Sequence, residues 1–148
     1  MFATGVTIVT ARTTAGELIG LTANSFNSVS LDPPLVLWSL ARAAGSMAVL
    51  STGSHYAINI LASDQKDLAE RFSIRGSDRW NGVAFTEGAG GAPVLTGAVA
   101  TFECFNRSRY EEGDHVIFVG EVEHCTYHVG ASPLLFHGAR YYTEHPLQ

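Results

Sequence analysis

The chain is dominated by short apolar stretches that alternate with turn-forming residues. The stretches are rich in valine, isoleucine, phenylalanine, tyrosine and threonine, which favour the extended backbone of a β-strand. Glycine, proline, aspartate or serine separates one stretch from the next, as is typical of strands joined by turns. We therefore predict strands over residues 5–12, 17–22, 34–41, 55–62, 98–105, 115–127 and 139–143.

The stretch AVATFECF, residues 98–105, illustrates the expected side-chain pattern. Successive side chains of a strand point to opposite faces of the sheet. One face would carry Ala98, Ala100, Phe102 and Cys104, and the other would carry Val99, Thr101, Glu103 and Phe105. Both faces are partly apolar, which is typical of a barrel strand that is also covered from outside.

Two short segments have helical character instead. In SDQKDLAERF, Ser63 or Asp64 is a candidate N-cap, and Leu68 and Phe72 lie four residues apart on one face. GSMAVLSTG is bounded by glycines, and we expect a helix that begins at Ser46 with its free N–H groups exposed. Strands in series with so few helices favour an antiparallel sheet closed into a barrel over a doubly wound α/β fold.

Composition indicates one folded domain over residues 1–148. Hydrophobic residues make up 46% of the chain and charged residues 16%, a balance that is too apolar for disorder. No apolar run approaches the roughly 18 residues that span a bilayer, and the N-terminus lacks the pattern of a secretory signal. We therefore expect no membrane segment and a cytoplasmic location, in which Cys104 and Cys125 stay reduced.

Charge excludes one class of partner. The formal net charge is −5, and no cluster of lysine or arginine offers the basic surface that nonspecific nucleic-acid binding needs. An acidic protein can still hold an anionic cofactor through local N–H groups, hydroxyls and a few arginines. Such neutral donors are concentrated in LTANSFNSVSLDPP, residues 21–34, which contains Thr22, Asn24, Ser25, Asn27, Ser28 and Ser30. These side chains either bond their own backbone, as in a capped turn ended by Asp32–Pro34, or donate to a ligand.

Other motifs carry less information. The segment EGAGGAP, residues 87–93, lacks the G-x-G-x-x-G spacing of a dinucleotide-binding loop and runs into a proline, so we interpret it as a flexible hairpin loop. His124 and His128 lie in a stretch that alternates like a strand, where four residues span about 13 Å and cannot hold one metal ion. We predict no metal site. Cys104 has no identified base near it, so a packing role is favoured over a nucleophilic one.

The segment EEGDHVIFVGEV, residues 111–122, combines a turn with a candidate functional histidine. Gly113 and Asp114 form a turn signal, and His115 begins the strand that follows. The imidazole could face a cleft while Asp114 fixes the turn. An ordinary hairpin with a partly exposed histidine explains the same residues.

From about Gly5 to Tyr142 the chain resembles the short-chain flavin reductases, which are reductase components of two-component flavin-dependent monooxygenases. The segments that carry the resemblance are, in order, GVTIVTA, LTANSFNSVSLDPPLVLWSL, YAINILA, GDHVIFVGEV and PLLFHGARYY. The resemblance implies a mainly β fold, an antiparallel Greek-key split β-barrel of the FMN-binding type with a few short helices. It also implies a homodimer with the flavin in a groove near the subunit interface. This chain begins where the family usually already has an N-terminal helix, so we interpret that helix as missing.

The resemblance implies the cofactor-binding residues as well. The positions that match the flavin site are Thr22, Ala23, Asn24, Ser25, Ser39, Leu40, Ala41, Ser46, Arg71 and Phe72. Those that match the nicotinamide-dinucleotide site are His115, Arg140 and Tyr141. Near Ser46 the family commonly has a hydroxyl-x-hydroxyl pair, of which this chain keeps only the second hydroxyl. Arg42 either adds positive charge to the flavin site or points to solvent.

We therefore expect an NAD(P)H:flavin oxidoreductase that uses NADH or NADPH to reduce FMN or FAD and supplies reduced flavin to a partner monooxygenase. Hydride would pass from nicotinamide C4 to flavin N5. The cofactors carry this chemistry, so no catalytic acid, base or nucleophile is expected, and His115 is assigned to orienting the nicotinamide. The alternative is a flavin-binding carrier or storage module without nicotinamide-dependent activity. Reduction of another substrate by the flavin also stays open.

Overall fold

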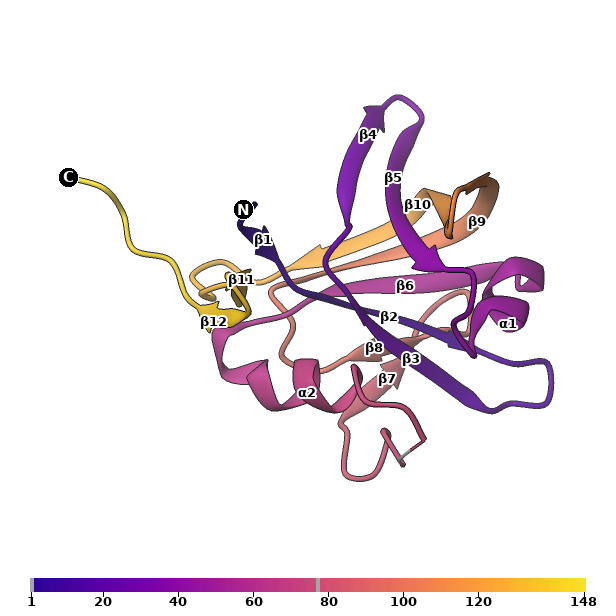
Figure 1. Ribbon diagram of the computed structural model, residues 1–148, viewed down its shortest axis with the longest axis horizontal. Coiled ribbons are helices and arrows are strands. Elements are labelled where there is room, and N and C mark those ends of the chain that lie inside the picture. The colour runs from indigo at the N-terminus through magenta and orange to yellow at the C-terminus, as the bar shows by residue number, and fades with distance from the viewer. Residues whose placement is uncertain (1, 77) are drawn as a thin grey trace.

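An antiparallel sheet that curls into a barrel forms most of the computed structural model, which describes residues 2–76 and 78–148 (Figure 1). The sheet has the strand order β3-β2-β6-β9-β10-β5-β4. In chain order its strands are β2 (Thr7–Arg12), β3 (Leu18–Ala23), β4 (Asn27–Leu31), β5 (Pro34–Ala41), β6 (His55–Ile60), β9 (Ala100–Glu112) and β10 (His115–Tyr127). The smaller sheets contain β1 (Thr4–Gly5), β11 (Leu135–His137) and β12 (Arg140–Tyr142), and β7 (Phe85–Glu87) with β8 (Pro93–Leu95).

The strand order makes the barrel a split Greek key. Strand β10 returns to pair with β5, so that β6, β9, β10 and β5 are neighbours in that order. Among the described residues, the edge strand β3 and strand β5, which is the neighbour of the other edge strand β4, are not joined by a ladder of backbone hydrogen bonds. A single side chain bridges them, because the N–H of Ser39 donates to Ser25 Oγ over 2.8 Å. The barrel therefore has a seam between β3 and β5.

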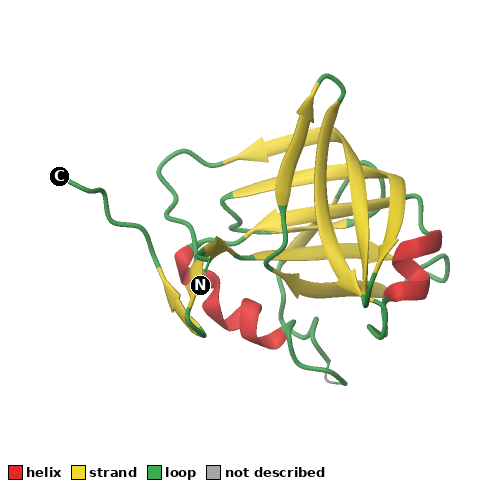
Figure 2. Ribbon diagram, turned by 45° about the horizontal axis from the view of Figure 1, so that its top comes forward, coloured by secondary structure: helices red, strands yellow, loops and turns green. Residues whose placement is uncertain are grey.

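Two short helices lie outside the barrel near opposite ends (Figure 2). Helix α1 (Met47–Thr52) follows β5, and α2 (Lys66–Arg71) follows β6 after the short 3-10 turn η1 (Ser63–Gln65). No helix in the described part of the chain is long and apolar enough to cross a membrane.

Aromatic packing fills the barrel and the space beneath α2. Inside the barrel, the rings of Trp38 and Phe118 stack with centroids 4.6 Å apart, and Tyr56 meets Trp38 edge-on at 5.6 Å. A second cluster packs α2 against the barrel through buried Phe72, whose ring meets Trp80 edge-on at 5.1 Å. Burial of such large apolar side chains is the main stabilising term of the fold.

The structure confirms the antiparallel, mainly β architecture and corrects several local predictions. The strand predicted over residues 98–105 is wrong at both ends, since β9 begins at Ala100 and runs to Glu112. Its second half is charged and exposed, and the ladder with β10 holds it as a strand without an apolar face. The polar residues Asn27–Leu31 are also a strand, because they pair with β5 through the turn at Asp32 and Pro33. Backbone pairing explains both cases, since ladder hydrogen bonds do not require apolar side chains.

The predicted helices are present with one change. Ser46 precedes α1 as expected, and Leu68 and Phe72 face the second core cluster as predicted. The N-cap prediction at Ser63 or Asp64 is wrong. The 3-10 turn begins there instead, and Gln65 Oε1 accepts the N–H of Ala62 over 2.9 Å. The glutamine thus satisfies the donor that precedes the turn, and α2 begins without a side-chain cap.

Candidate functional site

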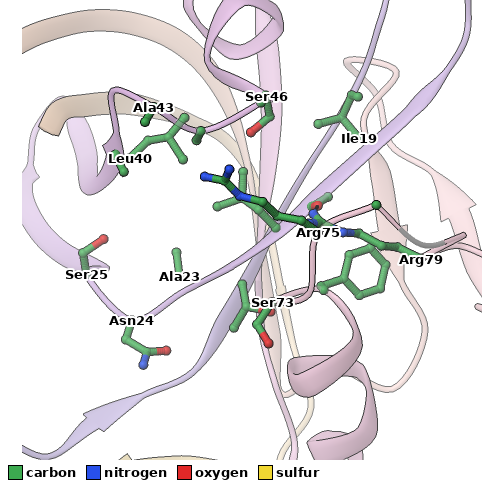
Figure 3. A pocket seen from close by; sticks show the side chains of 18 of the residues that line it. Ile19, Ala23, Asn24, Ser25, Leu40, Ala43, Ser46, Ser73, Arg75 and Arg79 are labelled. Carbon is green, nitrogen blue, oxygen red and sulfur yellow. Dashed lines mark hydrogen bonds between the residues drawn. The ribbon is translucent and has the colours of Figure 1, made fainter. Parts of the chain in front are cut away.

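A cavity of about 1050 Å³ lies in the seam between β3 and β5 (Figure 3). One wall is β3 and the residues that follow it, and another is the end of β5 with the segment that leads into α1. His115 at the start of β10 also lines the cavity. The remaining side is formed by Phe72, Ser73, Arg75, Gly76, Asp78, Arg79 and Trp80. The cavity thus exists because the barrel is not closed at this point.

Backbone contacts made by Thr22 fix the β3 wall against α2. Its hydroxyl donates to the carbonyl of Ala69 over 2.7 Å, and its N–H donates to the carbonyl of Phe72 over 3.3 Å. This docking places the Phe72 ring beside Gly20, where a Cβ atom would come within 2.6 Å of the ring. Glycine is required here because β3 and the ring approach so closely.

Ser25 and Ser39 close one end of the seam. Ser25 Oγ accepts the N–H of Ser39 over 2.8 Å and lies 3.2 Å from the Ser39 carbonyl, to which it can donate. Asn24 beside them is exposed at the cavity mouth. The hydroxyls of Thr22 and Ser25 therefore bond backbone groups while lining the cavity, which confirms the first role considered for this polar segment, and donation to a ligand stays a prediction.

Ser46 contributes a hydroxyl that is free to bond a ligand. It lies at the N-terminal boundary of α1, makes no side-chain capping bond, and lines the cavity together with Ala43 and Leu40 (Figure 3). The apolar part of the lining includes Leu21 and Phe72. An apolar wall with a few placed donors is the usual composition of a small-molecule site.

The loop after α2 supplies cavity residues that the sequence analysis missed. Ser73, Arg75, Asp78 and Arg79 all line the cavity. The guanidinium of Arg79 donates to the carbonyl of Gly20 over 2.7 Å and to that of Ile74 over 2.9 Å, so it ties the loop to β3. The sequence signal for these residues was the concentration of charge in SIRGSDRW, residues 73–80, which matches no recognised motif.

His115 reaches the cavity from the turn between β9 and β10. Its Nδ1 atom lies 2.8 Å from Asp114 Oδ1, and about half of its side-chain surface is exposed. The hydrogen bond with the ring, followed by the ring's charge, lowers the pKa of Asp114. Asp114 can therefore fix the orientation of the imidazole over the normal pH range, as the sequence suggested.

The family model described as the flavin reductase like domain matches residues 1–145. The chain belongs to this family. The resemblance seen in the sequence is thereby confirmed over nearly the whole chain.

Several flavin reductases are close in sequence or structure. An FMN reductase (NADH) from Agrobacterium fabrum is 44% identical over 140 residues, which cover 95% of this chain and 79% of the relative. The NADH:FAD oxidoreductase of Streptomyces globisporus, solved in complex with NAD and FAD fragments, is 40% identical with a TM-score of 0.93 and covers 98% of this chain and 87% of that one. The reductase component of a trigonelline monooxygenase from Acinetobacter baylyi is 39% identical over 142 residues. That match covers 96% of this chain but only 46% of the relative, so the chain spans less than half of that protein.

The structure brings most of the expected flavin residues of this family together. The cavity lining includes Thr22, Ala23, Asn24, Ser25, Ser39, Leu40, Ala41, Ser46 and Phe72. Arg71 lies outside it, because its guanidinium donates to the carbonyl of Asn81 over 2.7 Å. Arg42 also turns away and pairs with Glu111 at 3.7 Å. The volume and the donor set fit a flavin, since typical small-molecule sites measure roughly 300–1,000 Å³.

The three residues expected to bind the nicotinamide dinucleotide are separated in the single chain. His115 lines the cavity, whereas Arg140 and Tyr141 lie on β12 and are not part of its lining. The Tyr141 ring packs against Phe136 and lies 5.8 Å from Lys66 Nζ. Figure 1 shows β12 at the opposite end of the barrel from α1.

Proposed function

We propose that the chain is an NADH-dependent flavin reductase that reduces FMN or FAD and passes the reduced flavin to a monooxygenase. The observation that carries this proposal is the cavity in the seam, where an apolar wall, unpaired donors and His115 converge. The relatives support the cofactors, since their names specify NADH together with FMN or FAD. They also support the partner, because one relative is a monooxygenase reductase component.

In this proposal the protein binds the flavin and the nicotinamide cofactor and orients them toward each other. When bound, the nicotinamide and the flavin supply the hydride transfer from C4 to N5. Leu21 and Trp80, which are partly exposed in the cavity lining, offer apolar surface for the ring system, and Ser46 offers a hydrogen bond to its polar side. His115, held by Asp114, orients the nicotinamide, because hydride transfer depends steeply on the geometry of donor and acceptor.

Steady-state oxidation of NADH with added FMN or FAD tests the proposal. The chain should oxidise NADH at a rate that rises with flavin concentration and saturates. Absence of turnover, together with tight flavin binding in a fluorescence titration, would instead support a flavin carrier. The separation of His115 from Arg140 and Tyr141 in one chain is the observation that favours this second candidate.

The proposal includes the homodimer and the cytoplasmic location expected from the sequence. A second copy can supply Arg140 and Tyr141 to the cavity that contains His115, which one chain does not achieve. Light scattering at micromolar concentration tests the dimer.

Co-expression of His115→Ala and Arg140→Ala chains tests the shared site, because a mixed dimer would contain one intact site. Activity in the mixture well above that of either variant alone is expected, and a dimer with no such recovery would contradict a shared site.

A further inference from the structure

Four ionisable side chains line the cavity, and they differ in their partners. Arg79 donates to two carbonyl groups, and His115 is paired with Asp114. Asp78 is an anion. Arg75 makes no hydrogen bond or ion pair with any other residue that the structure describes. It is therefore the cation of the cavity that has its full hydrogen-bonding capacity available.

The position of Arg75 is set by the loop that carries it. The loop begins at the buried Phe72 ring, and Arg79 anchors it to β3 through the Gly20 carbonyl. Figure 3 shows the Arg75 side chain pointing from this loop into the cavity, toward the side that contains Ser46 and Leu40. The guanidinium thus faces the ligand space although the residue itself is exposed.

Four arginines that lie outside the cavity have partners there. Arg12 pairs with Glu87 and Arg107 with Glu121, while Arg71 and Arg42 contact groups outside the cavity. In a chain of net charge −5, an unpaired cation directed into a ligand cavity supplies the local positive charge that an anionic ligand needs in order to bind there. A guanidinium matches the oxygens of a phosphate better than an ammonium does, because it can donate two parallel hydrogen bonds.

We propose that Arg75 binds a phosphate group of the nucleotide held in the cavity. This inference rests on the proposed function and assigns a residue that the sequence comparison did not indicate. The phosphate belongs either to the flavin or to the nicotinamide dinucleotide. Both ligands carry phosphate esters, which a guanidinium binds in the same way. Arg79 is a positioning residue, because its own donors are used to hold the loop.

The first experiment compares riboflavin, which has no phosphate, with FMN, which has one. Both are titrated by fluorescence against the wild-type chain, Arg75→Gln, Arg75→Lys and the control Arg107→Gln, which removes a surface charge outside the cavity. A charge-assisted hydrogen bond at a partly open site predicts a loss of about tenfold in FMN affinity for Arg75→Gln. Riboflavin affinity should be unchanged, and Arg75→Lys should recover part of the FMN affinity. A loss of FMN affinity without a loss of riboflavin affinity shows that Arg75 binds the flavin phosphate.

The second experiment measures the KM for NADH with riboflavin as the acceptor. A rise of about tenfold in Arg75→Gln, with kcat little changed, assigns the dinucleotide phosphate. The inference is overturned if FMN affinity and the KM for NADH both stay at wild-type values. It is also overturned if riboflavin and FMN lose affinity equally, since the residue would then act through the shape of the loop. A wild-type chain that binds no flavin would refute the proposed function instead, so the two failures are distinguishable.

Discussion

Replacement of Gly20 by alanine tests the close contact between β3 and the ring that forms one side of the cavity. The added Cβ would lie 2.6 Å from Phe72 Cε1 and 3.1 Å from Trp80 Cζ2. Ordinary contacts between carbon atoms measure about 3.5–4.0 Å, so the Phe72 ring must move by roughly 1 Å. Phe72 is 1% exposed and packs in the second core cluster, which leaves little space for such a movement.

Overpacking of this kind costs about 1–3 kcal/mol. For a chain of this length, 1 kcal/mol corresponds to roughly 2–4 °C in Tm, so we expect Gly20→Ala to lower Tm by about 2–12 °C. The matched control is Gly5→Ala, because a Cβ at Gly5 meets no atom within 4 Å.

The assay is thermal unfolding followed by near-ultraviolet circular dichroism, with all variants at one protein concentration. Flavin affinity is measured on the same samples, since a displaced Phe72 ring would intrude on the cavity. The reasoning is refuted if Gly20→Ala melts within 1 °C of the wild type. An equal loss of stability in Gly5→Ala would also refute it, because the effect would then come from the backbone and not from the ring.

Three further outcomes are expected. Ser46→Ala should weaken flavin binding by roughly ten- to a hundredfold, because its hydroxyl would bond the charged part of the ligand. Its Tm should change little, because the Ser46 side chain makes no capping bond. An unchanged flavin affinity in a fluorescence titration would remove Ser46 from the site. His115→Ala should leave flavin affinity nearly intact and slow the flavin reduction seen in stopped-flow experiments over a range of NADH concentrations, since its ion pair with Asp114 is exposed and stabilises the fold little. Unchanged reduction kinetics would contradict its orienting role. Burial raises the pKa of the Cys104 thiol to about 12, so at pH 8 only about one thiol in ten thousand is ionised. Ellman's reagent should therefore modify exposed Cys125 in the native protein and Cys104 only after unfolding, and rapid reaction of two thiols would show that the barrel core is open.

The local periodicity of the sequence determined the class of the fold, and the resemblance of five segments to the flavin reductases indicated the family. Alternating apolar residues and turn signals are local properties, so the strands, the short helices and the hairpin at His115 could be predicted from them. The polar segment that contains Thr22 and Ser25 was recognised as a candidate site for the same reason. Strand β4 and the charged half of β9 could not be predicted, because the ladders that hold them depend on partners distant in the sequence.

Tertiary structure alone decided which charged residues reach the cavity. Arg42 and Arg71 were the arginines considered for the flavin site from the sequence, yet each contacts a group outside the cavity, while Arg75 points into it. The sequence also grouped His115 with Arg140, which the single chain keeps apart. The direction of a long flexible side chain depends on the carboxylates and carbonyls that the fold places near it. Those neighbours come from the seam between two strands that are not paired with each other, and no local pattern encodes such a seam.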